Sequence, residues 1–247
     1  MDIDQLVAKV AKGGRVQELS SGGERAVGSN RTFRLWTDNS TRILKAYGSA
    51  ARERRERHSI AVLKETQGLP KVLDRGADGD LHWAIFEDAG SWSLNSLPEN
   101  LSLAKRAGAI MRSVHESDPS KMTNMARGID QEWVTVDFIS TFKRLARYRG
   151  RLELPVDLLE EARSVRPPFA SPPRVAHTDP SPDNFLVNDA GDVTLINWEW
   201  ATLAPLEWDL SRAIWLLSLQ SGHAAAGAFA EGYGADMDTA QLDRWTV

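Results

Sequence analysis

The stretch that decides the fold is HTDPSPDNFLVNDAGDVTLINW, residues 177–198. Its two apolar segments, FLV and VTLINW, flank NDAGD, a run that is typical of a β-hairpin turn. Before them stands HTDPSPDN, in which Asp179 and Asn184 are five residues apart. Because Asp, Asn and Pro are common in ordinary loops, a plain turn is the simplest interpretation of HTDPSPDN taken alone.

The spacing of Asp179 and Asn184 also has a chemical interpretation. In kinase-type phosphoryl transfer, one Asp orients the attacking hydroxyl and accepts its proton, and an Asn later in the same loop binds magnesium. A second metal ligand normally follows the next hairpin, and that position, 18 residues after Asp179, holds Asn197. An amide there weakens the predicted hold on magnesium, because this hard cation prefers carboxylates.

Together with the sequence VTLINWEWATLAPLEWDLSRA, this segment resembles the catalytic half of the aminoglycoside phosphotransferase and choline kinase family. The resemblance implies an α+β, two-lobed protein-kinase-like fold, with a small antiparallel-sheet lobe and a mainly α-helical lobe. It implies an ATP-dependent (or GTP-dependent) phosphotransferase that uses magnesium. Asp179 is then the catalytic base or hydroxyl-orienting residue, Asn184 and Asn197 are metal ligands, and His177 is a structural member of the loop. Asp209 matches an acidic residue that braces this loop, and the family usually has Asp where this chain has Asn197.

The first third of the chain has the pattern of a small sheet. Apolar and β-branched runs separated by turn-rich segments predict an antiparallel meander. The expected strands are 16–19, 32–36, 42–47, 71–74 and 81–87. A helix is expected over residues 49–66, between the third and fourth of these strands.

A kinase needs a cation on this sheet to hold the nucleotide phosphates, and an acid on the following helix to orient that cation. Lys45, at the end of the third strand, fits the first role. Glu56 fits the second, because it precedes the apolar Ile60 and Leu63 by four and seven residues. Glu53 lies one turn earlier and remains an alternative, since ARERRERH is also typical of a solvated helix face.

Two further segments are similar to nucleotide-binding parts of the same family. The loop SSGGERAVGSN contains glycines, which permit a close approach of backbone N–H groups to phosphates. SNRTFRL, which begins at Ser29, resembles the opening of the family's second strand. AIFEDAG resembles the hinge that contacts adenine, and it assigns Glu87 and Ala89 to nucleotide binding. The plain alternatives are turn glycines and an ordinary edge strand.

Beyond residue 88, apolar residues recur every three or four positions, which predicts a mainly helical second lobe. Helices are expected over 101–116, 134–148 and 156–165, and again after Pro205. We therefore place a nucleotide-binding lobe at 1–88 and a catalytic and acceptor-binding lobe at 89–247. His115, at a helix end, and the Trp cluster at 198, 200, 208 and 215 are interpreted as packing residues.

Amino-acid composition excludes some kinds of chemistry and of binding partner. The chain has 247 residues, no cysteine and a formal net charge of −4. Thiolate chemistry is therefore excluded, and no general attraction to nucleic acid or to a membrane surface is expected. The opening MDIDQ has no apolar signal segment, and polar residues interrupt the longest charge-free stretch, between Arg212 and Glu231. We expect a cytoplasmic protein with a small-molecule partner.

The acceptor is expected to be small. Only 12 residues separate Asn197 from Asp209, which leaves no room for an activation segment that would dock a peptide. Residues 1–88 hold 15 Lys and Arg against 13 Asp and Glu, whereas residues 89–247 hold 15 against 21. An acidic acceptor lobe favours a cationic or polyhydroxyl acceptor such as an aminoglycoside, an amino sugar or another antibiotic.

Two other functions stay open. Asn197 motivates a nucleotide-binding pseudokinase with a sensing or scaffolding role, and an unrelated α+β binding domain is the third hypothesis. The amide at this position fits a natural pseudokinase, an active enzyme that tolerates it, or an engineered Asp→Asn change.

Overall fold

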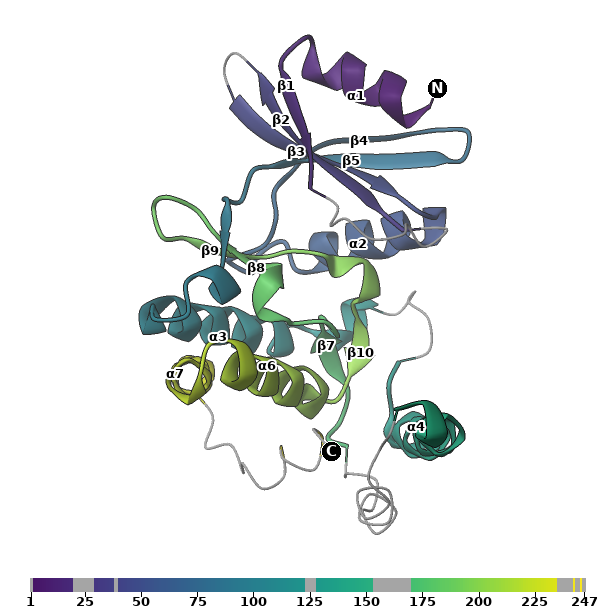
Figure 1. Ribbon diagram of the computed structural model, residues 1–247, viewed down its shortest axis with the longest axis vertical. Coiled ribbons are helices and arrows are strands. Elements are labelled where there is room, and N and C mark those ends of the chain that lie inside the picture. The colour runs from purple at the N-terminus through teal and green to yellow at the C-terminus, as the bar shows by residue number, and fades with distance from the viewer. Residues whose placement is uncertain are drawn as a thin grey trace.

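The computed structural model describes residues 2–19, 29–37, 40–122, 128–152 and 170–234, together with Leu242 and Trp245. The first lobe contains α1 (Ile3–Ala11), β1 (Arg15–Glu18), β2 (Arg31–Thr37), β3 (Ser40–Tyr47), α2 (Ala50–Val62), β4 (Val72–Asp78) and β5 (Leu81–Glu87). The second lobe contains β6 (Trp92–Ser93), α3 (Leu101–His115), α4 (Gln131–Leu152), β7 (Arg174–Ala176), β8 (Phe185–Val187), β9 (Val193–Leu195), β10 (Thr202–Ala204), α6 (Leu206–Gln220) and α7 (His223–Tyr233). The expected α+β architecture of two unlike lobes is confirmed (Figure 1).

The first lobe is built on one antiparallel sheet, with the strand order β1-β2-β3-β5-β4. Successive side chains of a strand point to opposite faces, so Leu44 and Lys45 on β3 face different surroundings. Leu44 joins Leu6, Phe33 and Ile85 in an apolar cluster that includes helix α1. Lys45 projects from the other face, where α2 lies, and this alternation places it between the lobes.

Helix α1 was not expected from the sequence. It begins with a capping box in which the Gln5 N–H donates to Asp2 Oδ1 at 2.8 Å and the Asp2 N–H donates to Gln5 Oε1 at 3.1 Å. This arrangement satisfies two N–H groups that a helix start otherwise leaves unpaired. The helix packs on the sheet through Leu6, which is fully buried. The DIDQ sequence, residues 2–5, contains the Asp and Gln of this capping box and could have indicated the helix start.

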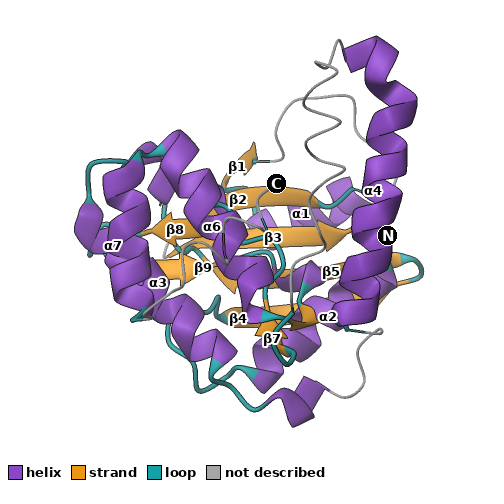
Figure 2. Ribbon diagram, turned by 90° about the horizontal axis from the view of Figure 1, so that it is seen from below, coloured by secondary structure: helices purple, strands orange, loops and turns teal. Residues whose placement is uncertain are grey.

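In the second lobe, α7 packs against both α3 and α6, as seen from below in Figure 2. The largest side chains of its core are the fully buried Phe185, Trp198 and Phe229. Strands β8 and β9 confirm the hairpin predicted around NDAGD. The predicted helix over 156–165 lies outside the described residues. Among the helices of the described ranges, none is long and apolar enough to cross a membrane.

The connection between the lobes is fixed by an arginine of the sheet. Arg34 on β2 pairs with Asp88 at 2.9 Å and donates to the Gly90 carbonyl oxygen at 2.7 Å. Gly90 has a φ of +121°, and a Cβ at this position would lie 2.1 Å from the Val187 carbonyl oxygen. Only glycine therefore lets the connection pass so close to β8.

Gly108 provides a test of the packing between α3 and α7. A Cβ at this position would lie 2.0 Å from the Phe229 carbonyl oxygen, a backbone atom that cannot rotate away. We expect Gly108→Ala to lower the free energy of unfolding by about 2 kcal/mol or more, through overpacking. Gly227→Ala is the matched control, because Gly227 lies on the exposed side of α7 with nothing within 4 Å of an added Cβ, and alanine is the better helix former. Urea unfolding of both variants measures the contrast, and equal stabilities would contradict this packing.

Candidate active site

The loop from His177 to Asn184 connects β7 to β8 and is held by one buried carboxylate. Asp209, fully buried in α6, accepts the His177 N–H on Oδ2 and the Thr178 N–H on Oδ1, both at 2.7 Å. Thr178 has a φ of +70°, so these bonds hold the chain in a conformation that β-branched residues seldom adopt. The expectation that Asp209 braces this loop is confirmed.

His115 also reaches Asp209. Its Nε2 lies 3.2 Å from Asp209 Oδ2, and its Nδ1 lies 2.9 Å from the Tyr233 hydroxyl. The side chain is buried, and it links α3, α6 and α7 at the base of the loop. His115 therefore orders the loop from below, which agrees with its interpretation as a packing residue.

His177 is a structural member of the loop. Its Nε2 lies 2.8 Å from the Ile196 carbonyl oxygen, and the Asp179 N–H donates to its Nδ1 at 3.3 Å. Burial lowers the pKa of His177, despite the opposing effect of Asp209. A neutral ring with a proton on Nε2 satisfies both contacts.

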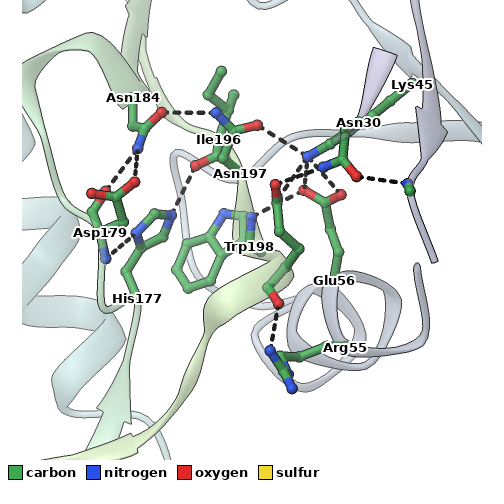
Figure 3. A network of polar contacts seen from close by, with 12 residues as sticks. Asn30, Lys45, Arg55, Glu56, His177, Asp179, Asn184, Ile196, Asn197 and Trp198 are labelled. Atoms are coloured by element: carbon green, nitrogen blue, oxygen red, sulfur yellow. Dashed lines mark hydrogen bonds and ion pairs between the residues drawn. The ribbon is translucent and has the colours of Figure 1, made fainter. Parts of the chain in front are cut away.

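The expected catalytic base and both expected metal ligands form one chain of contacts (Figure 3). Asn184 Nδ2 donates to the Asp179 carbonyl oxygen at 2.7 Å and lies 3.3 Å from Asp179 Oδ2. Asn197 Nδ2 donates to Asn184 Oδ1 at 2.8 Å. Asn197 Oδ1 in turn accepts from Lys45 Nζ at 3.0 Å. The structure thus brings together residues from β3 and from both ends of the β8–β9 hairpin.

Lys45 is the charged centre of the site. Its Nζ lies 3.0 Å from Glu56 Oε2 and 2.7 Å from Glu199 Oε2, and its side chain is buried. Burial alone would lower the pKa of Lys45, but the two carboxylates outweigh it and raise that pKa. Of the two acids considered on α2, Glu56 reaches Lys45, whereas Glu53 pairs with Arg57 at 3.1 Å on the helix surface.

Glu199 is the site residue that the sequence analysis missed. It lies in the short helix Trp198–Trp200, and its Oε1 accepts from Asn30 Nδ2 at 2.8 Å. Burial would raise the pKa of Glu199, but Lys45 outweighs burial and lowers it. Its position two residues after Asn197, in an otherwise aromatic WEW segment, was a visible signal for a buried acid with a partner.

An apolar pocket of about 90 Å³ opens beside Lys45. Its lining includes Glu87 and Ala89 of the connection between the lobes, as well as Asn197. The remaining wall is mainly aliphatic and aromatic, and includes Leu19, Ile43, Phe86, Leu186 and Ile196. An apolar slot with a cation at its end suits a flat ring that carries an anionic group. Ser29 is exposed, two residues before β2, and does not line this pocket. Gly22, Gly23 and Gly28, the glycines of the loop before it, lie outside the described residues.

A model of the phosphotransferase enzyme family matches residues 25–242. The chain belongs to this family. A comparison with curated proteins finds none that matches. The resemblance inferred from HTDPSPDN and the segments after it is therefore confirmed.

Solved structures of family-type enzymes share the fold. An aminoglycoside-3'-phosphotransferase of type VIII superposes with a TM-score of 0.65 and 18% identity, over 98% of this chain and 96% of that one. Spectinomycin phosphotransferase, in complex with ADP and spectinomycin, superposes with a TM-score of 0.70 and 17% identity, over 99% of this chain and 84% of that one. A macrolide 2'-phosphotransferase from Brachybacterium faecium superposes with a TM-score of 0.69 and 16% identity, over 99% of this chain and 88% of that one. At these identities the likeness shows the fold alone.

The donors at this site suit a magnesium ion only in part. Asn184 and Asn197 supply two amide oxygens, which are hard ligands but carry no charge. Among the described residues, no group of three or more His, Cys, Asp or Glu is placed to hold a metal. The two amides therefore fit an ion that takes most of its negative ligands from nucleotide phosphates, as magnesium commonly does.

Asp209→Asn tests how the phosphotransferase loop is held. An amide can accept from one of the two loop N–H groups but presents its own N–H₂ to the other, so one buried donor loses its charged acceptor. We expect the free energy of unfolding to fall by about 2–3 kcal/mol, measured by urea denaturation. Asp189→Asn, the same change in the exposed hairpin turn, should have almost no effect. Equal effects of the two changes would show that Asp209 does not brace the loop.

Proposed function

We propose that this chain transfers a phosphoryl group from ATP to a hydroxyl group of a small molecule. The observation that carries the proposal is the continuous chain of contacts from Asp179 through Asn184 and Asn197 to Lys45. Transfer needs a hydroxyl-orienting carboxylate and a phosphate-binding cation at the same point, and these contacts join the two. Family membership supports the reaction class.

Each group then has a role that follows from its position. Lys45, oriented by Glu56, would bind the nucleotide phosphates, and the backbone of Glu87 and Ala89 would contact the base in the apolar pocket. Ser29 and the loop before it would cover the phosphates. In this proposal residues 1–88 bind the nucleotide and residues 89–247 bind the acceptor. The ADP named in the spectinomycin phosphotransferase complex supports an adenine nucleotide, with GTP as the alternative.

Asn184 and Asn197 would hold a magnesium ion through their amide oxygens. When bound, it would neutralise charge on the phosphoryl group. Asp179 would hold the acceptor hydroxyl for in-line attack and take its proton. His177 and Asp209 would keep Asp179 in place through the loop backbone.

A nucleotide-binding pseudokinase is the second candidate, and one observation favours it. Lys45 already has two carboxylate partners, and its contact at position 197 is with the neutral amide of Asn197. A phosphate must therefore compete with Glu199 for the lysine. In that case the site binds a nucleotide without turning it over.

Asp179→Asn separates chemistry from nucleotide binding. The amide keeps the size of the side chain but cannot accept the hydroxyl proton, so turnover should fall by about 10²–10⁴-fold. Nucleotide affinity, measured by calorimetry with ATP and with GTP, should stay nearly unchanged. Asp183→Asn, an exposed change in the same loop, is the matched control and should keep its turnover. Full turnover by the Asp179 variant would remove this residue from the reaction.

Asn197→Asp tests whether position 197 belongs to the proposed metal site. The change adds one negative charge next to Asn184 with almost no change in shape, so magnesium-dependent nucleotide binding should strengthen by about tenfold. Turnover should rise as well, because Lys45, Asp179 and Asn184 are already in place. Asn100→Asp, at an exposed helix start, controls for the added charge. If a magnesium titration shows no change in binding or turnover, Asn197 is not at the metal site.

A further inference from the structure

A second pocket lies along α6. Its volume is about 210 Å³, and it is lined by Trp208, Ser211, Arg212, Trp215 and Trp245. Trp208, Arg212 and Trp215 are four and three residues apart, which places them on one face of the helix. Because Asp209 on the same helix braces the loop of Asp179, the position of this face relative to Asp179 is fixed.

Arg212 joins this pocket to the proposed catalytic carboxylate. Its guanidinium donates to Asp179 Oδ1 at 2.9 Å, and its side chain is 50% exposed. Asp179 Oδ2 lies 3.3 Å from Asn184 Nδ2, so Arg212 and Asn184 contact different oxygens of the same carboxylate. An acceptor hydroxyl that approaches Asp179 from this pocket meets Arg212 first.

The walls of the pocket are aromatic. Trp215 is 47% exposed, so its interpretation as a packing residue is wrong. Trp208 is held by edge-on contacts with Trp133 and Trp245, at centroid distances of 5.3 and 6.3 Å. Indole rings fixed in this way offer flat apolar surface at little cost in side-chain entropy. This surface suits a ring.

The lining of the pocket carries a positive charge. Among the described residues that line it, none is acidic, and Arg212 carries a full positive charge. Arginine binds carboxylate, phosphate and sulfonate groups through paired N–H donors, whereas it repels an ammonium group. The local chemistry therefore differs from the acidic balance of residues 89–247 as a whole.

We propose that this pocket is the acceptor site and that it takes a hydroxylated ring compound with an anionic group, which draws Arg212 away from Asp179. The inference rests on the proposed phosphotransferase function and names its acceptor class. With Arg212 on the anion, Asp179 Oδ1 is free to receive the hydroxyl. The hydroxyl oxygen then bonds to the terminal phosphorus of the nucleoside triphosphate, and the bond from that phosphorus to its bridging oxygen breaks. The nucleoside diphosphate leaves with that electron pair, and the hydroxyl proton passes to Asp179.

A probe series that differs only in charge tests the acceptor class. The probes are para-hydroxymethylbenzoate and para-hydroxymethylbenzenesulfonate as anions, benzene-para-dimethanol as the neutral compound, and para-hydroxymethylbenzylamine as the cation. Binding is measured without nucleotide, by calorimetry and by the fluorescence of the pocket tryptophans. We expect both anions to bind at least about tenfold more tightly than the neutral probe, and the cation to bind more weakly still.

Two variants assign the selectivity to the pocket. Arg212→Gln should lower the affinity for the anionic probes to that for the neutral probe and leave the affinity for the neutral probe unchanged. Trp215→Ala should weaken all probes alike, because it removes the apolar wall and no charge. Arg112→Gln is the matched control, since Arg112 is also a helical arginine, 50% exposed and paired with an acid, but lies on α3 outside the pocket. It should leave every probe unchanged.

The outcomes distinguish this inference from the proposed function. If the neutral or cationic probe binds as tightly as the anions, if Arg212→Gln keeps the preference, or if no probe binds, the acceptor assignment is overturned. ADP release with each probe is measured separately. Phosphorylation of the neutral or cationic probe alone would keep the phosphotransferase function and overturn this inference. Selective anion binding without any ADP release would keep the pocket and count against the function.

Discussion

Lys45 is a buried charge, and the groups that surround it tie the two lobes together. Taking an ammonium group out of water costs several kcal/mol unless opposite charges and hydrogen bonds replace the water. Glu56 comes from α2 and Glu199 from the segment after β9, so the compensation is drawn from both lobes. Glu56 also accepts the Trp198 N–H at 3.0 Å, which fixes the turn that carries Glu199. Removal of either acid leaves Lys45 with one carboxylate partner and with an unfilled hydrogen-bonding position in a buried site.

The parts of this arrangement that the sequence could predict are those encoded locally. The spacing of Asp179 and Asn184, the strand that carries Lys45 and the helix that carries Glu56 all follow from short-range patterns, and the structure brings these residues together. Glu199 could not be assigned to Lys45, because the two are 154 residues apart and no local pattern records a contact of that kind. Helix α1 is a different case. Its capping box was legible in the sequence, but the helix is short, and its burial depends on a sheet formed later in the chain.

Charge summed over a lobe and charge at a site give different expectations for the acceptor. The acids of residues 89–247 favour a cation when they are counted together, yet several of them are already engaged: Asp209 holds backbone N–H groups, and Asp179 is paired with Arg212. A carboxylate that is fully hydrogen-bonded offers little attraction to a ligand. The charged group among the described residues that line the aromatic pocket is the guanidinium of Arg212, which pairs with Asp179 at 2.9 Å. The charge of the acceptor that a site favours therefore depends on how its side chains pair in space, and amino-acid composition does not contain this information.

The same reasoning explains what the amide at position 197 does to the resting site. Lys45 and its two carboxylates already carry a net charge of −1, and a third carboxylate at 197 would raise this to −2 around one ammonium group. Like charges at this distance repel strongly in a buried site, and only a divalent cation would relieve them. With Asn197 the cluster is closed without such an ion, because the amide accepts from Lys45 and donates to Asn184. The left-handed backbone of Asn197, with φ of +68°, is one that Asn and Asp both tolerate. The amide thus closes the cluster around Lys45 with neutral hydrogen bonds, and it does so without adding a charge that would need a cation.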